Sequence, residues 1–174
     1  GRRLAPLQAL AEEIDGLAIA CDMSDAASIE ALFTAAKAQT GRVDIAINSA
    51  GGLAASPIAM LTPEQIQPTL DVSFIGALLC FRYAAEAMTD GGSIITISSL
   101  TARLPGPALS VYAAARAGID YAIKVAALEY GPKSIRFNSI AAGLIQTDMT
   151  DAMFTTSDSE TRFIPHIPAG RMGT

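Results

Sequence analysis

Residues 43–52 read Val-Asp-Ile-Ala-Ile-Asn-Ser-Ala-Gly-Gly (VDIAINSAGG), a compact apolar run that passes directly into a turn of small residues. A short apolar run bounded by glycine predicts a buried β-strand, here over 43–48. Similar runs occur at 17–21, 93–98 and 134–140. Because these runs are nearly continuous and do not alternate with polar residues, they are typical of strands in a parallel sheet that is covered on both faces.

Helical segments separate these strands. The sequence predicts one helix over 4–14, a second from a Ser24 or Asp25 cap to Gly41, a third from the Thr62–Gln65 capping box to about Met88, and a fourth over 111–130, ended by Gly131-Pro132. Beyond Ala141 the pattern indicates loop with weak helix. Since strands and helices alternate with short links, the predicted fold class is α/β, with helices on both faces of a parallel sheet.

The composition is that of a soluble globular protein with one domain over residues 1–174. Hydrophobic residues make up 51% of the chain, which is enough for a sizeable core. Only 17% of the residues are charged, so we expect part of the surface to be apolar or covered by partner subunits. The net charge of −5 argues against a nucleic-acid-binding protein. Cys21 and Cys80 lie in apolar runs, and we expect small buried hydrophobes without a disulfide.

Nothing in the sequence indicates export or a membrane. No signal peptide is visible, and no apolar run approaches the roughly 20 residues that a membrane helix needs, so the expected location is the cytoplasm. The chain begins at Gly1 without an initiator methionine and stops at Thr174 without a terminating element. We therefore expect it to be a fragment of a longer chain.

Polar and glycine residues gather where the predicted strands end. Ligands of open α/β sheets bind beyond the carboxyl ends of the strands. The segments that fall at this edge are Asp22, 48–51, Ser98-Ser99 and Ala142-Gly143, with Tyr112 at the start of its helix. Their convergence predicts a binding site. No cluster of cysteine and histidine supports a metal site.

Tyr112 and Arg116 stand one helical turn apart in residues 110–120, Ser-Val-Tyr-Ala-Ala-Ala-Arg-Ala-Gly-Ile-Asp (SVYAAARAGID). A cation at this spacing favours the charged form of a phenol, whose pKa is otherwise near 10. A tyrosine placed in this way can give or take a proton. The alternative is an exposed helix face on which Arg116 pairs with Asp120.

Taken in order, these segments resemble the short-chain dehydrogenase/reductase family. The resemblance covers almost the whole chain and rests on Asp22-Met23, the NSAG turn at 48–51, Ile97-Ser98-Ser99, Tyr112-x-x-x-Arg116 and AAGLIQTDM at 141–149. Each segment alone is weak, and their order and spacing carry the resemblance. It implies a Rossmann-type, doubly wound parallel sheet that binds NAD or NADP and moves hydride between nicotinamide and a carbonyl or alcohol.

The resemblance also implies roles for single residues. Tyr112 would be the general acid/base, and Ser99 would hold the substrate oxygen. Cofactor contacts would come from Arg2, Asp22, Met23, Asn48, Ala50 and Gly51 on the adenosine side, and from Tyr112, Arg116, Gly143, Ile145 and Thr147 on the nicotinamide side. The segment after Thr147, with Phe154, Phe163 and His166, would shape the substrate pocket, although His166 itself receives no role.

Two residues depart from the family pattern. Arg116 stands where the family has lysine, and Ser73 stands where it usually has asparagine. Arginine can supply charge and donate to ribose hydroxyls, but it cannot pass protons because it does not deprotonate at neutral pH. Lys124 lies about 12 Å farther along the helix and cannot substitute. The sequence therefore predicts intact reacting groups with a weakened proton supply.

The first residues of the chain favour NADP, with NAD possible. Gly1 stands where NAD-preferring members tend to carry an acid, and the following Arg2 suits a 2′-phosphate. The glycine-rich turn that holds the pyrophosphate in this family is not among the 174 residues. By the same resemblance, the apolar faces of 74–88 and 112–130 predict a homodimer or homotetramer. The alternative is that these helices only cover their own sheet.

Simpler structural roles remain open for several of these residues. Ser73 could be only a small residue at a helix irregularity, Asp22 a helix N-cap, and Asn48 a tie for its turn.

Two functions also remain open. Ser99 and Tyr112 favour an oxidoreductase that acts on a small carbonyl or alcohol. The changes at Arg116 and Ser73 favour a cofactor-binding pseudoenzyme with a regulatory or scaffolding role.

Overall fold

The structure is a computed structural model that describes residues 1–153 and 164–174. It divides into two compact units, Gly1–Ile140 and Ala141–Thr174, which are described separately. The single domain expected over 1–174 stays a prediction.

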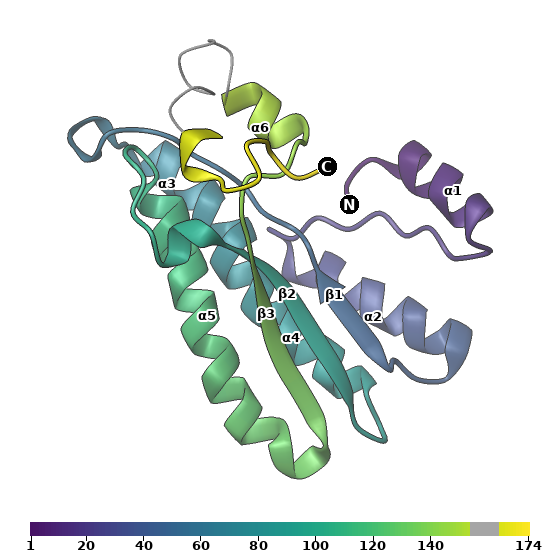
Figure 1. Ribbon diagram of the computed structural model, residues 1–174. Coiled ribbons are helices and arrows are strands. Elements are labelled where there is room, and N and C mark those ends of the chain that lie inside the picture. Colours follow the sequence, from purple (N-terminus) through teal and green to yellow (C-terminus); the bar gives the residue numbers. More distant parts are fainter. Residues whose placement is uncertain (154–163) are drawn as a thin grey trace. The chain divides into compact units, whose positions relative to one another are not determined.

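Three strands form the sheet: β1 (Ile45–Asn48), β2 (Gly92–Ser99) and β3 (Ile135–Ala142). Their order is β1-β2-β3, and β1 and β2 run parallel with Asn48 beside Thr96. The long helix α5 (Ser110–Tyr130) connects β2 to β3 (Figure 1). The strands predicted over 43–48, 93–98 and 134–140 are therefore confirmed, with ends that differ by one or two residues.

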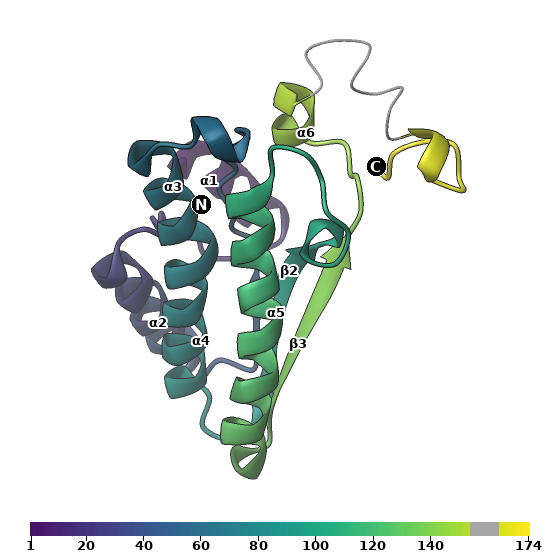
Figure 2. The ribbon, with the colours of Figure 1, turned by 90° about the vertical axis from the view of Figure 1, so that its left-hand side faces the viewer.

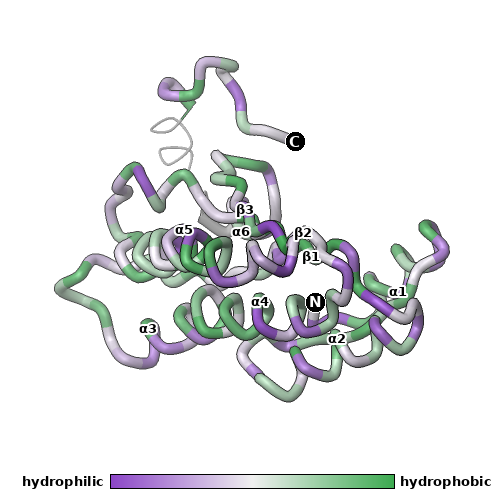
Figure 3. The backbone as a smooth tube through the Cα atoms, turned by 90° about the horizontal axis from the view of Figure 1, so that it is seen from below, coloured by the Kyte–Doolittle hydropathy of each residue, from purple (hydrophilic) through white to green (hydrophobic). Residues whose placement is uncertain are grey.

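Helices α4 (Gly76–Ala87) and α5 lie side by side against one face of the sheet (Figures 1 and 2). Ile94 of β2 is buried in the core between them, with Phe81 of α4 and Ile119 of α5. Apolar residues predominate along both helices (Figure 3), which explains why their sequence pattern was strong. A further helix, α2 (Ala26–Thr40), packs against α4.

The other face of β1 is apolar and open. Ala46 and Asn48 point toward the helices and are buried, whereas Ile45 and Ile47 are each 64% exposed. Successive side chains of a strand point to opposite faces. Apolar residues on both faces thus produce the near-continuous run from which the strand was predicted.

The prediction of a strand over residues 17–21 is wrong. Helix α1 (Leu4–Glu13) is followed by an irregular segment in which Leu17 is 55% exposed. Only Cys21, at its end, is buried, and its N–H donates to the carbonyl of Gly1 at 2.8 Å. A strand needs a neighbouring strand to accept and donate along its length, and the three-stranded sheet begins at β1.

Helix ends follow the predicted signals. The Asp25 side chain caps α2 by accepting the N–H of Ala27, and Gly41 ends that helix with a left-handed φ of 81°. Helix α3 (Pro63–Leu70) begins at the predicted capping box, in which the Gln65 side chain accepts the N–H of Thr62 at 3.2 Å. These local signals are confirmed because each depends only on residues within one turn.

The single helix predicted from Thr62 to Met88 is interrupted. Between α3 and α4, residues Asp71–Ile75 form a wider π-helical turn. Short 3-10 turns lie at Ile58–Met60, Leu100–Ala102, Gly131–Lys133 and Ile164–His166, and α6 covers Asp148–Met153. No helix among the described residues combines the length and apolar character needed to cross a membrane.

Candidate active site

The turn after β1 is held by the last residue of that strand. The Asn48 side chain is buried, and its Oδ1 accepts the N–H of Ala50 at 3.0 Å. Its Nδ2 is buried without a hydrogen-bond partner. The role left open for Asn48, as a tie for the turn, is therefore present in the structure.

Ser73 ties the same turn from the other side. It is fully buried in the π-helical turn, where its Oγ accepts the N–H of Gly52 at 3.0 Å and donates to the carbonyl of Gly52 at 3.1 Å. Ser73 does lie at a helix irregularity, as the simpler interpretation had it. It also fixes the backbone of Gly52, because one hydroxyl satisfies both polar groups of that residue.

Arg116 is buried, with 3% of its surface exposed. Its Nη2 donates to the carbonyl of Ala50 at 3.1 Å, and its Cζ lies 5.2 Å from the centre of the Tyr112 ring. The alternative of a surface arginine paired with Asp120 is therefore wrong. The guanidinium places a fixed positive charge against the tyrosine ring.

The turn must approach this guanidinium closely. A Cβ atom at Gly51 would overlap Nη2 of Arg116, so only glycine fits here without moving the arginine. The Nε and Nη1 atoms of Arg116 are buried and have no hydrogen-bond partner. Buried donors without acceptors are uncommon and indicate a missing partner or a functional constraint.

Ser99 is the last residue of β2, and Tyr112 is the third residue of α5. Both side chains are partly exposed. The Oγ of Ser99 accepts the N–H of Thr101 at 3.2 Å and the hydroxyl of Thr101 at 2.9 Å. Both bonds use the oxygen as acceptor, which leaves the hydroxyl hydrogen of Ser99 available to donate. The turn Leu100–Ala102 packs against α5, so the segment after Ser99 stays beside the helix that carries Tyr112.

Asp22 and Arg2 come together at the other end of the predicted site. Oδ1 of Asp22 accepts the N–H and the hydroxyl of Ser24 at 2.9 and 2.7 Å. The backbone bond first, and then the hydroxyl bond, hold the pKa of the Asp22 carboxyl below its ordinary value, and the charge of Arg2 acts in the same direction. The N-cap interpretation of Asp22 is wrong, because Asp25 caps α2.

Gly76 is a structural requirement that the sequence analysis missed. A Cβ at Gly76 would overlap the carbonyl oxygen of Met23, so α4 begins in direct contact with the segment after Asp22. Gly52 was also missed as the partner of Ser73. No signal in the sequence could have identified either contact, because the partners are 21 or more positions away.

The remaining predicted cofactor residues lie in the second unit. Ile145 forms a parallel bridge with Gly173, and the N–H of Thr147 donates to Oγ1 of Thr150 at 2.9 Å. The roles of Gly143, Ile145 and Thr147 stay predictions. Phe154 and Phe163 lie outside the described residues, and His166 is exposed in its 3-10 turn.

Cys21 and Cys80 are free thiols in one small buried cluster with Ile29, as the sequence indicated. Burial, followed by the neighbouring Cys21, raises the pKa of the Cys80 thiol to about 12. Within residues 1–153 and 164–174, no group of three or more histidine, cysteine, aspartate or glutamate side chains is placed to hold a metal ion.

Known proteins are similar to this chain over nearly its whole length. The sequence profile of the family described as Enoyl-(Acyl carrier protein) reductase matches residues 2–174. A short chain dehydrogenase/reductase of Aspergillus oryzae is 39% identical over 79% of this chain and 54% of its own length. A 3β-hydroxysteroid dehydrogenase of Eggerthella lenta is 35% identical over 93% of this chain and 64% of its own.

The fold is shared as well. The crystal structure of a short-chain type dehydrogenase/reductase from Mycobacterium marinum superimposes with a TM-score of 0.91 at 30% identity, over 99% of this chain and 70% of that chain. The chain thus spans between about half and two thirds of the length of the curated relatives named above.

Proposed function

Because this chain belongs to the short-chain dehydrogenase/reductase family and has its Rossmann-type fold, we propose that it serves an oxidoreductase that transfers hydride between NAD(P)(H) and a small carbonyl or alcohol. The observation that carries the proposal is the buried guanidinium of Arg116 against the ring of Tyr112. A fixed cation against the ring would stabilise the negative charge that develops on the Tyr112 oxygen as its proton leaves in the transition state.

Two hydroxyls do the chemistry in this proposal. When bound, the nicotinamide supplies or accepts the hydride. As the carbonyl oxygen of the substrate gains negative charge, Ser99 donates a hydrogen bond to it and Tyr112 gives it a proton. The hydroxyl hydrogen of Ser99 is available for this because Thr101 occupies only its acceptor side. In the oxidation direction, Tyr112 takes the proton back.

The residues present fit a dinucleotide. Nε and Nη1 of Arg116 are buried donors without acceptors, and a ribose hydroxyl would reach them once the turn 49–52 opens around the dinucleotide. Arg116 and the turn held by Asn48 would thus serve the ribose groups, while Arg2 beside Asp22 would serve the adenosine end. Arg2, which follows Gly1 where NAD-preferring members tend to carry an acid, supports NADP, because arginine is well suited to the additional 2′-phosphate.

Proton supply to Tyr112 is the weak step. Arg116 stays protonated at neutral pH and cannot pass a proton. The Ser73 hydroxyl donates to and accepts from Gly52, so it is already engaged on both sides. We therefore expect slower turnover than the reacting groups alone would permit.

The same contacts favour a second candidate, a cofactor-binding pseudoenzyme. Arg116 and Ser73 both bind backbone atoms of the turn 49–52, which is structural work that needs no chemistry. In this case Tyr112 and Ser99 would line a binding site for the dinucleotide only.

One experiment separates the two candidates. Binding of NADPH is measured by isothermal titration calorimetry, because the chain contains no tryptophan, and turnover by the absorbance of the reduced nicotinamide with a panel of small aldehydes and ketones. Turnover that is lost in Tyr112→Phe while NADPH still binds supports the oxidoreductase. Binding without turnover of any carbonyl supports the pseudoenzyme, and the absence of binding overturns both.

Assembly and location belong to the same proposal. Leu78 of α4 and Leu128 of α5 are 38% and 81% exposed, which supports pairing of subunits through the helices predicted over 74–88 and 112–130. A homodimer or homotetramer in the cytoplasm is the expected state.

A further inference from the structure

Thr101 lies two residues after Ser99, in the 3-10 turn Leu100–Ala102 that directly follows β2. Its side-chain hydroxyl donates to Oγ of Ser99 at 2.9 Å, and its backbone N–H donates to the same atom at 3.2 Å. Thr101 is partly exposed, so water could satisfy its hydroxyl, yet that hydroxyl is turned toward Ser99. One residue therefore supplies two donors to a single serine oxygen.

The side-chain bond exceeds what the turn itself requires. Ser99 caps the turn by accepting the backbone N–H of Thr101, and a cap of this kind needs only that bond. The neighbouring Ser98 has no such donors, because its Oγ is buried without a hydrogen-bond partner among the described residues. The second bond therefore acts on the Ser99 hydroxyl and not on the fold of the turn.

Two donors on one hydroxyl oxygen fix the direction of its hydrogen. A serine hydroxyl has one hydrogen and two lone pairs that can accept. Thr101 occupies both acceptor positions, so the Ser99 hydrogen is left with the one remaining direction. A hydroxyl that accepts hydrogen bonds is also polarised into a stronger donor. Ser99 is thus prepared to donate and not to accept.

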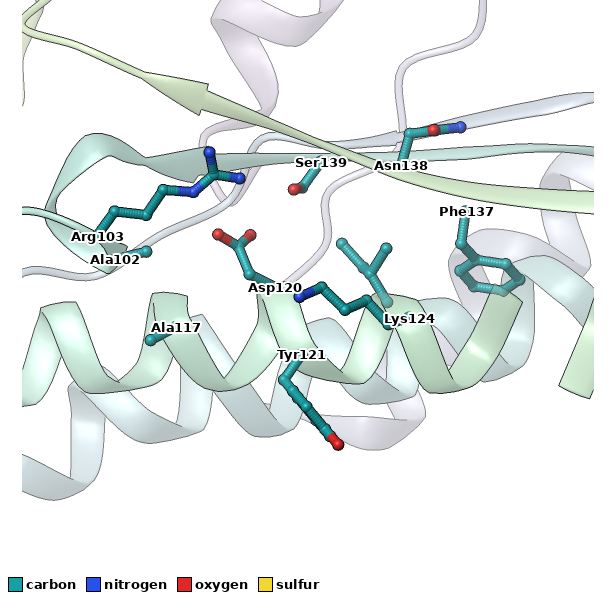
Figure 4. A pocket seen from close by; sticks show the side chains of 10 residues that line it. Ala102, Arg103, Ala117, Asp120, Tyr121, Lys124, Phe137, Asn138 and Ser139 are labelled. Carbon is teal, nitrogen blue, oxygen red and sulfur yellow. The ribbon is translucent and has the colours of Figure 1, made fainter. Parts of the chain in front are cut away.

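The turn is held beside the helix that carries Tyr112. It packs against α5, and its last residue, Ala102, lines the same pocket as Ala117 of that helix (Figure 4). This packing keeps Thr101 in place next to the end of β2. The two bonds to Ser99 are therefore made by a supported segment, which is what precise positioning of a reacting group needs.

We propose that Thr101 is a positioning residue, which holds the Ser99 hydroxyl as a fixed hydrogen-bond donor toward the substrate oxygen. The inference rests on the proposed function, in which Ser99 binds that oxygen. Negative charge grows on the oxygen as hydride arrives, so a donor already aimed at it stabilises the transition state more than the uncharged carbonyl. The contribution of Thr101 should therefore appear in kcat more than in KM.

The test measures carbonyl reduction by the full-length protein, followed by NADPH absorbance with a ketone that the parent turns over. Thr101→Val keeps the shape of the side chain and the backbone donor and removes only the hydroxyl. We expect kcat to fall by about threefold to tenfold, the effect of one hydrogen bond, while KM stays nearly constant. Thr101→Ser restores the hydroxyl and should recover most of kcat. Thr34→Val, on the exposed face of α2, is the matched control and leaves both constants unchanged.

A double-mutant cycle assigns the effect to Ser99. In the Ser99→Ala background no hydroxyl remains for Thr101 to position, so adding Thr101→Val should have little further effect on the residual kcat. A merely structural role would lower kcat by the same factor in both backgrounds. Thermal unfolding checks that each variant is folded.

The inference and the proposed function fail in different ways. The inference alone is overturned if the parent reduces the ketone and Thr101→Val keeps its kcat, if Thr101→Ser recovers nothing, or if the factor is equal in both backgrounds. A parent that binds NADPH without turning over any carbonyl overturns the proposed function, and this inference with it.

Discussion

Nη2 of Arg116 donates to the carbonyl oxygen of Ala50 at 3.1 Å, across 66 positions of sequence. This bond joins the first turns of α5 to the turn after β1, and it holds the guanidinium against the Tyr112 ring. The charge that acts on the tyrosine is thus fixed by a backbone contact and not by a counter-ion. The predictions below for Arg116 and Gly51 depend on this arrangement.

Replacing Arg116 by lysine should accelerate turnover. Lysine keeps a positive charge near Tyr112 and restores a group that can pass protons, and general acid–base catalysis contributes about 100-fold or more when it is complete. We expect at least a tenfold rise in kcat for carbonyl reduction, measured by NADPH absorbance at saturating substrate. Arg82→Lys, on the exposed side of α4, is the matched control. Equal kcat values for Arg116→Lys and the parent would show that proton supply does not limit the reaction.

Gly51→Ala should destabilise the fold through Arg116. The added Cβ overlaps Nη2, and overpacking of this kind costs about 1–3 kcal/mol. Urea unfolding of the single variants and of Gly51→Ala/Arg116→Ala measures the coupling between the two positions. The penalty at Gly51 should largely disappear once the guanidinium is removed. If it persists in full, the clash is with another part of the structure.

Ser73→Ala should leave the N–H and carbonyl of Gly52 unpaired in a buried place. The expected loss in the free energy of unfolding is about 1–3 kcal/mol, from chemical denaturation. Thr34→Ala on the exposed face of α2 removes a hydroxyl without these contacts and should change stability by less than about 0.5 kcal/mol. Similar effects for the two variants would contradict the role given to Ser73.

The stability of the protein should fall above pH 9 because of Cys80. Its pKa is about 12 in the folded state against an ordinary value of 9.0, so the unfolded chain loses this proton first as the pH rises. The stabilisation is complete below pH 9 and is lost progressively towards pH 12, with about 1 kcal/mol lost by pH 10. Urea unfolding at pH 7 and pH 10 should show a smaller decrease in Cys80→Ala than in the parent. An equal decrease in both proteins would assign the effect to other groups.

Leu128→Glu should weaken the proposed assembly. A charge placed at this exposed position of α5 opposes burial of the helix against a second subunit. Light scattering after size exclusion should show a shift toward monomer, with the circular dichroism spectrum unchanged. Glu129→Lys, next to it, is the control for a change of charge. A parent protein that is already monomeric would remove the basis for this proposal.

Local signals in the sequence were sufficient for most of the elements. The Asp25 cap, the Gly41 end of α2 and the capping box at Thr62 each depend on neighbours within one turn, and all are confirmed. The prediction of a strand over 17–21 was wrong because a strand, unlike a cap, depends on residues far away in the sequence. Its apolar pattern is real, but a strand exists only where another strand lies beside it.

For the candidate site, too, the sequence determined some features and the tertiary structure decided the others. The sequence by itself determined which residue types are available: a serine at the end of β2, a tyrosine at the start of α5 and an arginine one turn later, because order and spacing are properties of the chain. Only the tertiary structure decided that Arg116 is buried against Ala50 and Tyr112, and that Ser73 is bound to Gly52. Burial and hydrogen-bond partners depend on segments that are distant in the chain, and the free energy of a charge is set by those neighbours and not by its position in the sequence.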